Sequence, residues 1–241
     1  MSGHSKWHNI QKRKGAVDAR RAGMFTKLAK GITVATREGG NDPSFNFQLR
    51  IAIDAAKAAN MPKENIERSI KRGTGEGAEG QIEEIIYEGF GPGGVAFLVQ
   101  CLSDNRNRTV AEVKYLVGKH GGTIGNPGSV MWMFERKGVV TFLEPKQIKD
   151  REAFELAMIE AGAQDIQESE GTLQVVSEVG DLQAVVGALE SLSLKPDGAG
   201  IEYFPKDRVP VSTKEEQEQL ETLLDALDEN EDVDTVYTNA E

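Results

Sequence analysis

The chain has 241 residues, 39% of them hydrophobic, and a formal net charge of -11. This length suits one large domain or two to three small ones, and no apolar stretch approaches the roughly 18 residues that span a membrane. The single cysteine, Cys101, excludes an internal disulfide, and no apolar segment follows the N-terminus as in a secretory signal, so we expect a cytoplasmic protein.

Charge divides the chain into two parts. Residues 1–75 hold 15 Lys/Arg and 6 Asp/Glu, a net charge of +9, whereas residues 76–241 hold 13 and 33, a net charge of -20. A basic segment on an acidic protein is typical of a site for polyanions. The alternative is an uneven distribution without a binding role, which only keeps the protein in solution.

Residues 1–23 lack a helical apolar period and are predicted to form an arm. From Phe25, apolar residues recur at helical spacing until Gly39-Gly40 ends the run. Asp42-Pro43 resembles an N-cap followed by the first position of a second helix. The inner face of that helix would carry Phe45, Leu49, Ile53 and Ala56.

A third helix is predicted to open at Pro62 and to stop at Gly73. Together the three helices form a small bundle over about residues 20–75. Residues 72–80 are rich in glycine and are predicted to be a flexible linker.

Beyond residue 80 the period becomes that of strands. Residues 82–88 and 94–102 are predicted strands joined by a turn cluster, and residues 129–135 are another strand. Thr109 and Glu112 have the spacing of a capping box, which would open a helix that ends at Gly121-Gly122.

A self-contained series follows, with the order strand, helix, strand, strand, helix, strand. Its members are predicted at residues 139–143, 147–161, 165–168, 173–177, 181–192 and 200–204. This order is that of the ferredoxin-like unit. Ser212 and Glu215 then resemble a second capping box, before a Leu-rich helix and a strand at residues 234–237.

A lone helix and strand at the C-terminus cannot bury their own apolar face. We therefore predict an α+β fold in which a small N-terminal helical bundle precedes two α/β-sandwich, ferredoxin-like domains, the last inserted into the middle one. The predicted domains are residues 1–80, residues 81–137 with 207–241, and residues 138–206.

Nothing in the sequence predicts a catalytic, metal or cofactor site. His4 and His8 stand four apart, but no third ligand accompanies them. Lys119 lacks the surrounding pattern of a phosphate-binding loop, and Cys101 lies in an apolar run as a core thiol does. We therefore do not expect an enzyme.

The basic arm is the best candidate site, because Lys and Arg neutralise phosphates and Trp7 is able to stack on an unpaired base. The alternatives are a disordered tail with Trp7 packed on the bundle and, for the third helix, a solvated helix end. The candidate nucleic-acid contacts are Lys6, Trp7, Lys12, Arg13, Lys14, Arg20, Arg21, Lys27, Lys30, Arg68, Lys71 and Arg72.

A second candidate, for an anion, lies just before a helix N-terminus, where backbone N–H groups attract negative charge. It comprises Asn105, Arg106, Asn107 and Arg108. The alternative is a strand-to-helix turn with Asn caps.

Several strings resemble the YebC family. They include Gly3-His-Ser-Lys-Trp7, Asn60-Met-Pro-Lys63, Ile70-Lys-Arg-Gly-Thr-Gly75, Tyr87-Glu-Gly-Phe-Gly-Pro-Gly-Gly94 and Leu102-Ser-Asp-Asn-Arg-Asn-Arg-Thr109. The likeness spans almost the whole chain and implies three domains. His8 and Phe45-Asn-Phe47 depart from the usual family residues.

The resemblance implies a regulator of gene expression. Family members are described as probable DNA-binding transcriptional regulators, mitochondrial relatives look like translational activators, and bacterial relatives are linked to the ribosome and to stalling at proline runs. The expected partner is therefore nucleic acid, either DNA or ribosomal RNA, without a membrane. An acidic scaffold whose α/β domains bind basic proteins is the remaining hypothesis.

Overall fold

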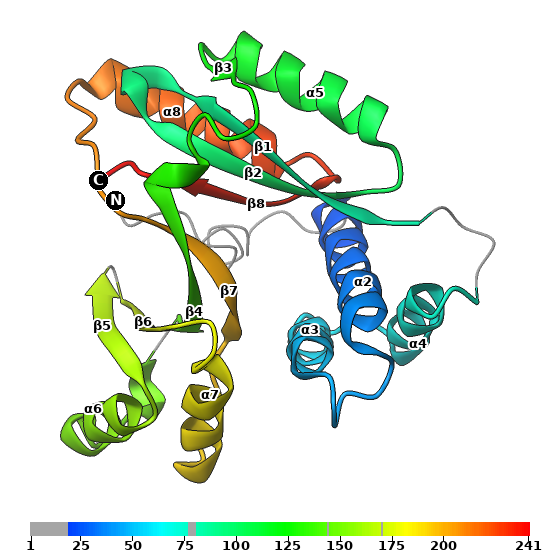
Figure 1. Ribbon diagram of the computed structural model, residues 1–241, viewed down its shortest axis with the longest axis vertical. Coiled ribbons are helices and arrows are strands. Elements are labelled where there is room, and N and C mark those ends of the chain that lie inside the picture. The colour runs from blue at the N-terminus through cyan, green and yellow to red at the C-terminus, as the bar shows by residue number, and fades with distance from the viewer. Residues whose placement is uncertain (1–18, 77–80, 144, 170) are drawn as a thin grey trace.

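The computed structural model describes residues 19–76, 81–143, 145–169 and 171–241 (Figure 1). The N-terminal part is helical and is followed by two four-stranded antiparallel sheets, which confirms the predicted α+β fold class. The helices and strands are α2 Ala19–Gly39, α3 Phe47–Ala58, α4 Lys63–Gly73, β1 Glu83–Phe90, β2 Ala96–Ser103, α5 Arg106–Lys119, β3 Thr123–Ile124, β4 Phe134–Phe142, α6 Arg151–Glu160, β5 Ala163–Ser169, β6 Thr172–Ser177, α7 Leu182–Ser191, β7 Gly198–Pro205, α8 Lys214–Asp228 and β8 Val233–Thr238. Short 3-10 helices are η1 Pro92–Gly94, η2 Met131–Met133 and η3 Pro145–Gln147.

The three N-terminal helices pack around a shared apolar core. Helix α2 contacts both α3 and α4, and Ile32, Leu49 and Ile66 bring one buried side chain from each helix to that core. The bundle is also fixed to the rest of the molecule. Val34 of α2 packs against Ile82 and Leu102 of the first sheet region, and α3 contacts β7.

The predicted start of the second helix is wrong. Asp42 is engaged in a turn, where its Oδ1 accepts hydrogen bonds from the N–H of Ser44 at 2.9 Å and from the Ser44 hydroxyl at 2.7 Å. The N-cap is Asn46, whose Oδ1 accepts from the N–H of Leu49 at 3.0 Å, so Phe45 precedes the helix and is 89% exposed.

The first sheet has the strand order β3-β1-β2-β8. Helices α5 and α8 lie side by side on one face of it, and both contribute to the same core, α5 through Val113 and Val117 (Figure 1). Strand β8 pairs with β2, so the C-terminal segment completes a sheet that the chain began more than a hundred residues earlier.

Both predicted capping boxes are displaced. Helix α5 is capped by Asn105, and the hydroxyl of Thr109 bonds to Asp232 rather than capping a helix. Helix α8 is capped by Thr213 with Glu216, one residue later than predicted. In each case a neighbouring Thr or Asn offers the same capping chemistry, and for α5 the long-range bond from Thr109 to Asp232 leaves Asn105 as the cap.

The second sheet has the order β5-β6-β4-β7, with α6 and α7 contributing to its core. This strand order and the βαββαβ sequence of elements are those of the ferredoxin-like unit. The predicted strand at residues 129–135 is wrong: η2 occupies its centre, and β4 then runs unbroken across Gly138. A Cβ at Gly138 would lie 2.7 Å from Oγ of Ser177, so this glycine permits close packing and does not end a strand.

The boundary predicted between residues 137 and 138 lies within β4. The division of the chain into three domains stays a prediction.

Candidate nucleic-acid interface

The basic arm lies mostly outside the described residues. This applies to Lys6, Trp7, Lys12, Arg13 and Lys14. The backbone of Arg20 and Arg21 belongs to the first turn of α2. The described part of the predicted interface is therefore the helical bundle that follows the arm.

Two lysines of α2 make contacts inside the molecule. Nζ of Lys27 lies 2.6 Å from the carbonyl oxygen of Asp228, and Nζ of Lys30 lies 2.7 Å from Oδ1 of Asp232. Their side chains are only 14% and 13% exposed. In this structure both lysines hold α2 against the α8–β8 connection, so we leave them out of the proposed interface.

Asp232 is the centre of this contact. Its Oδ1 accepts from Lys30, and its Oδ2 accepts from Nη2 of Arg108 at 2.8 Å, from Oγ1 of Thr109 at 2.8 Å and from Oγ of Ser103 at 3.1 Å. Burial alone would raise the pKa of Asp232, but the bonds from Lys30, Arg108 and Thr109 outweigh it and lower the pKa to about 2. The carboxylate therefore stays charged and links the bundle to the first sheet.

The predicted anion contact before α5 is only partly available. Oδ1 of Asn105 accepts from the N–H of Arg108 at 3.1 Å, which makes Asn105 the helix cap, and the guanidinium of Arg108 pairs with Asp232. Arg106 and Asn107 remain exposed. All four predicted residues are exposed, but Asn105 acts as the helix cap and Arg108 is paired with Asp232.

Helix α4 supplies the clearest described part of the predicted site. Arg68 and Lys71 are exposed, and neither forms an ion pair within the described part of the chain. Arg72 lies further inward, with Nη2 3.5 Å from Oδ2 of Asp104. Positive charge near the C-terminal end of α4 also interacts favourably with the helix dipole.

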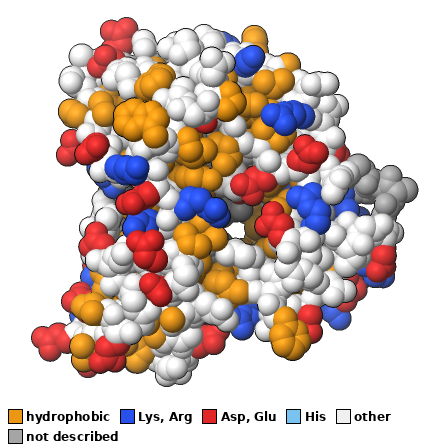
Figure 2. Space-filling view, viewed as in Figure 1, with side chains coloured by type: hydrophobic (Ala, Val, Ile, Leu, Met, Phe, Trp, Pro, Cys, Tyr) orange, Lys and Arg blue, Asp and Glu red, His pale blue; other side chains and the backbone are white. Residues whose placement is uncertain are grey.

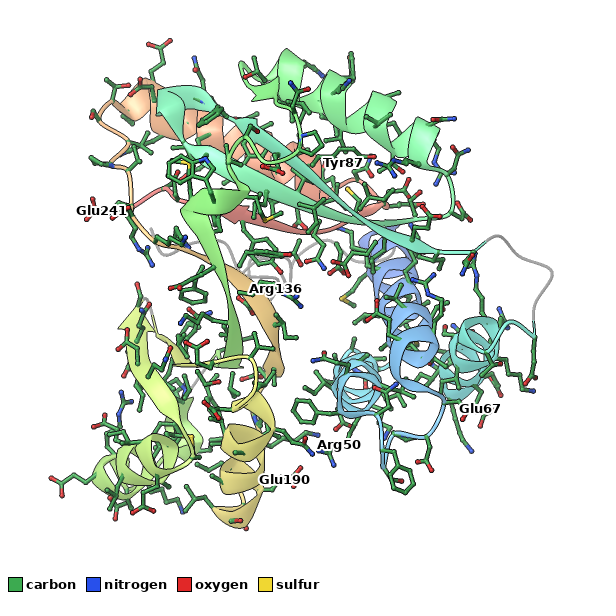
Figure 3. All side chains as sticks on the ribbon, viewed as in Figure 1. Arg50, Glu67, Tyr87, Arg136, Glu190 and Glu241 are labelled. Carbon is green, nitrogen blue, oxygen red and sulfur yellow. The ribbon has the colours of Figure 1, made fainter. Side chains whose placement is uncertain are left out.

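A central hollow of about 250 Å³ lies between the bundle and the two sheets (Figure 2). Its lining includes Glu38, Glu84, Glu202 and Asp234 against a single cation, Arg136, which Figure 3 places between the sheets. Burial raises the pKa of Glu84, as do the charges of Glu38 and Asp234, while Arg136 opposes the shift. The excess of negative charge makes this hollow unsuited to phosphates.

The described residues show no group of three or more His, Cys, Asp or Glu that is arranged to hold a metal ion. Cys101 lies in the core, and burial raises the pKa of its thiol to about 12, so it is neutral and inaccessible. Among the helices of the described ranges, none combines the length and the apolar character needed to cross a membrane.

Comparison with known proteins shows the family. Residues 5–76 match the TACO1/YebC N-terminal domain, and residues 82–240 match the TACO1/YebC second and third domains. The chain belongs to the TACO1/YebC family. This confirms the resemblance found in the sequence.

Relatives in the TACO1/YebC family are similar over the full length. A protein of Persephonella marina is 49% identical, covering 100% of this chain and 96% of its own length, and one of Desulfosudis oleivorans is 50% identical with the same coverage. Both are named "Probable transcriptional regulatory protein". The crystal structure of the conserved hypothetical protein Aq1575 from Aquifex aeolicus matches with a TM-score of 0.89 and 43% identity, covering 98% of this chain and 97% of that one.

Sequence reasoning missed Asp232. It lies 124 residues from Arg108 and 202 from Lys30, in a stretch with many other acids. No local pattern distinguishes it from its neighbours, since only the packing of α2 beside the α8–β8 connection brings the two cations to it.

Proposed function

We propose that this TACO1/YebC family member regulates gene expression by binding nucleic acid through its basic N-terminal part, residues 1–75, without acting as an enzyme. The observation that carries the proposal is the charge division, +9 in residues 1–75 against -20 in the remainder. A polyanion is attracted to the first part and repelled by the second. The regulatory names of the relatives support the same conclusion.

The proposed contacts combine the arm with α4. Cations there neutralise phosphates and release counterions, which gives affinity that does not depend on sequence, and Trp7 adds stacking on an unpaired base. The set comprises Lys6, Trp7, Lys12, Arg13, Lys14, Arg20, Arg21, Arg68, Lys71 and Arg72.

DNA-bound control of transcription is the function that the relatives' names favour. A second candidate is control of translation on the ribosome, and the charge of -20 on residues 76–241 favours it. Long duplex DNA would repel that part, whereas a ribosome offers both RNA phosphates and basic proteins.

The first experiment measures binding of the full chain to DNA and RNA over a range of salt concentrations. Replacing Lys12, Arg13, Lys14, Arg20 and Arg21 together by Gln is expected to weaken binding and flatten its salt dependence. A control removes two exposed charges of the second sheet region, Lys149→Gln with Lys195→Gln, and should leave both the affinity and its salt dependence unchanged. Unaltered binding and regulation in the arm variant would instead favour a scaffold that binds basic proteins through its acidic domains.

The second experiment separates the two targets. A tagged full-length protein is followed in ribosome sedimentation at low salt and, in parallel, in retention on promoter DNA. Co-sedimentation that the arm variant loses supports the translation role. Absence from ribosomal fractions together with retention on DNA would overturn it and support the transcription role.

A further inference from the structure

Helix α5 carries a basic, partly aromatic surface inside the acidic part of the chain. Arg106, Lys114 and Lys119 are exposed on it, and Tyr115 is 65% exposed. Glu112 is the one acid in the helix sequence. Figure 2 shows Lys and Arg side chains on the upper part of this face, over the region that α5 occupies in Figure 1.

The three cations are available to an external anion. None of them forms an ion pair with any residue that the structure describes, in contrast to Arg108 of the same helix, which lies 2.8 Å from Asp232. Glu112 keeps its negative charge, but it forms no ion pair with these cations in the described ranges, and its Oε2 accepts a hydrogen bond from Nδ2 of Asn230 at 2.8 Å. With four basic residues against one acid in its sequence, α5 keeps a net positive charge.

The exposed ring of Tyr115 is able to stack on a base. Nζ of Lys119, one turn further on, lies over one face of the ring at 5.9 Å from its centroid, a cation–π contact. The neighbouring exposed positions are Ala111 and Gly118, and a Cβ added at Gly118 would meet nothing within 4 Å. Since Ala111 and Gly118 are small, the ring face that Lys119 does not cover is open to a flat ligand.

We propose that this α5 surface is a second nucleic-acid contact and that it binds a single strand, with an unpaired base stacked on Tyr115 and phosphates on the three cations. The inference rests on the proposed function for the presence of nucleic acid and goes beyond it in the site and the strand state. The helix, 14 residues long, presents these groups over about 20 Å.

Two observations favour a single strand over a duplex. An exposed tyrosine stacks on a base only where that base is free of its own neighbours, which a duplex does not provide. In addition, α8 packs beside α5 and exposes Glu218, Glu221 and Asp225. These acids would repel the second strand of a duplex lying across both helices.

The test uses the full chain and measures fluorescence anisotropy with single-stranded DNA, single-stranded RNA and the matching duplexes. Tyr115→Ala is expected to weaken single-strand binding roughly 5- to 150-fold, the value of one stacked base, and to leave duplex binding unchanged. Tyr115→Phe keeps the ring and should retain the affinity of the original chain. Circular dichroism checks that both variants are folded, as expected because Tyr115 is exposed and contributes little to the core.

A second variant tests the charges. Lys114→Gln with Lys119→Gln should lower the slope of log K against log salt by about 1.4 for a single strand, since each phosphate that is no longer neutralised lowers it by about 0.7. The control with Lys149→Gln and Lys195→Gln removes equal charge elsewhere and should leave the slope unchanged.

The outcomes separate this inference from the proposed function. If the original chain binds no nucleic acid, both fail. A second outcome is that the original chain binds, the arm variant binds more weakly and every α5 variant binds normally. The proposed function then stands, and the role of the α5 surface as a second contact is overturned. Equal losses of affinity for duplex and single strand would overturn the assignment to a single strand.

Discussion

Nζ of Lys30 in α2 lies 2.7 Å from Oδ1 of Asp232, although 202 residues separate them in the sequence. The pair joins the basic helical bundle to the acidic part of the chain. Because Asp232 also accepts from Arg108 of α5, one carboxylate connects three segments. The two oppositely charged parts are thus held together by some of the charges that distinguish them.

Removing the Asp232 carboxylate should destabilise the protein. Its side chain is 5% exposed, and Asp232→Ala leaves Lys30 and Arg108 without their shared partner. We expect a loss of about 3 kcal/mol in the free energy of unfolding, measured by urea denaturation. Asp225→Ala, an exposed change on α8, is the control and should change stability by less than about 0.5 kcal/mol. A loss equally small for Asp232→Ala would show that the interaction adds no stability.

The same carboxylate should make stability depend on acid pH. The pKa of Asp232 is about 2 in the folded protein, below the ordinary value of 3.8 for an aspartate, so the ionised form favours folding. The contribution is fully present above pH 3.8 and is lost as the pH falls through about 2. It amounts to about 2 kcal/mol.

Urea denaturation between pH 7 and pH 2 measures that contribution. The variant Asp232→Asn cannot ionise at this position and should show a flatter fall in stability than the original chain. Parallel curves for the two proteins would contradict the assignment of the acid dependence to Asp232.

The sequence predicts the order of the elements because apolar periodicity depends on local residues, as in the Leu-rich helix α8. It fails at the caps, where several Ser, Thr, Asp or Asn side chains compete and distant contacts select one. Thr109 looks like an N-cap until Asp232 is placed beside it. Lys27 and Lys30 look like surface cations for the same reason, since their acidic partners lie about 200 residues away.

The cap residue Asn46 should contribute measurably to the stability of the protein. Its Nδ2 donates to the carbonyls of Ala35 and Gly40, each at 2.7 Å, while its Oδ1 accepts from the N–H of Leu49. Asn46→Ala removes the donors to both carbonyls and the side-chain acceptor that caps α3, so we expect a loss of about 2 kcal/mol in the free energy of unfolding. Thermal or urea unfolding measures it, with Ser44→Ala in the exposed turn as a control that should be nearly neutral. Equal stability of the two variants would mean that α3 needs no cap.

Glu88 should control the order of the segment before β4. One oxygen accepts from the N–H of Gly128 at 2.6 Å, and the other accepts from those of Val130 and Met131, each at 2.8 Å. Burial raises the pKa of Glu88, but these three bonds outweigh it and lower the pKa, so the carboxylate is charged at neutral pH.

Glu88→Gln replaces one accepting oxygen by an amide that only donates. Because at least one N–H of the segment then lacks its acceptor, we expect a loss of about 2 kcal/mol and faster hydrogen exchange at residues 128–131. Exchange measured by mass spectrometry tests this locally, with Glu83→Gln at an exposed position of β1 as the matched control. Exchange that stays as slow as in the original chain would show that other contacts hold the segment, and the carboxylate would then have no structural role there.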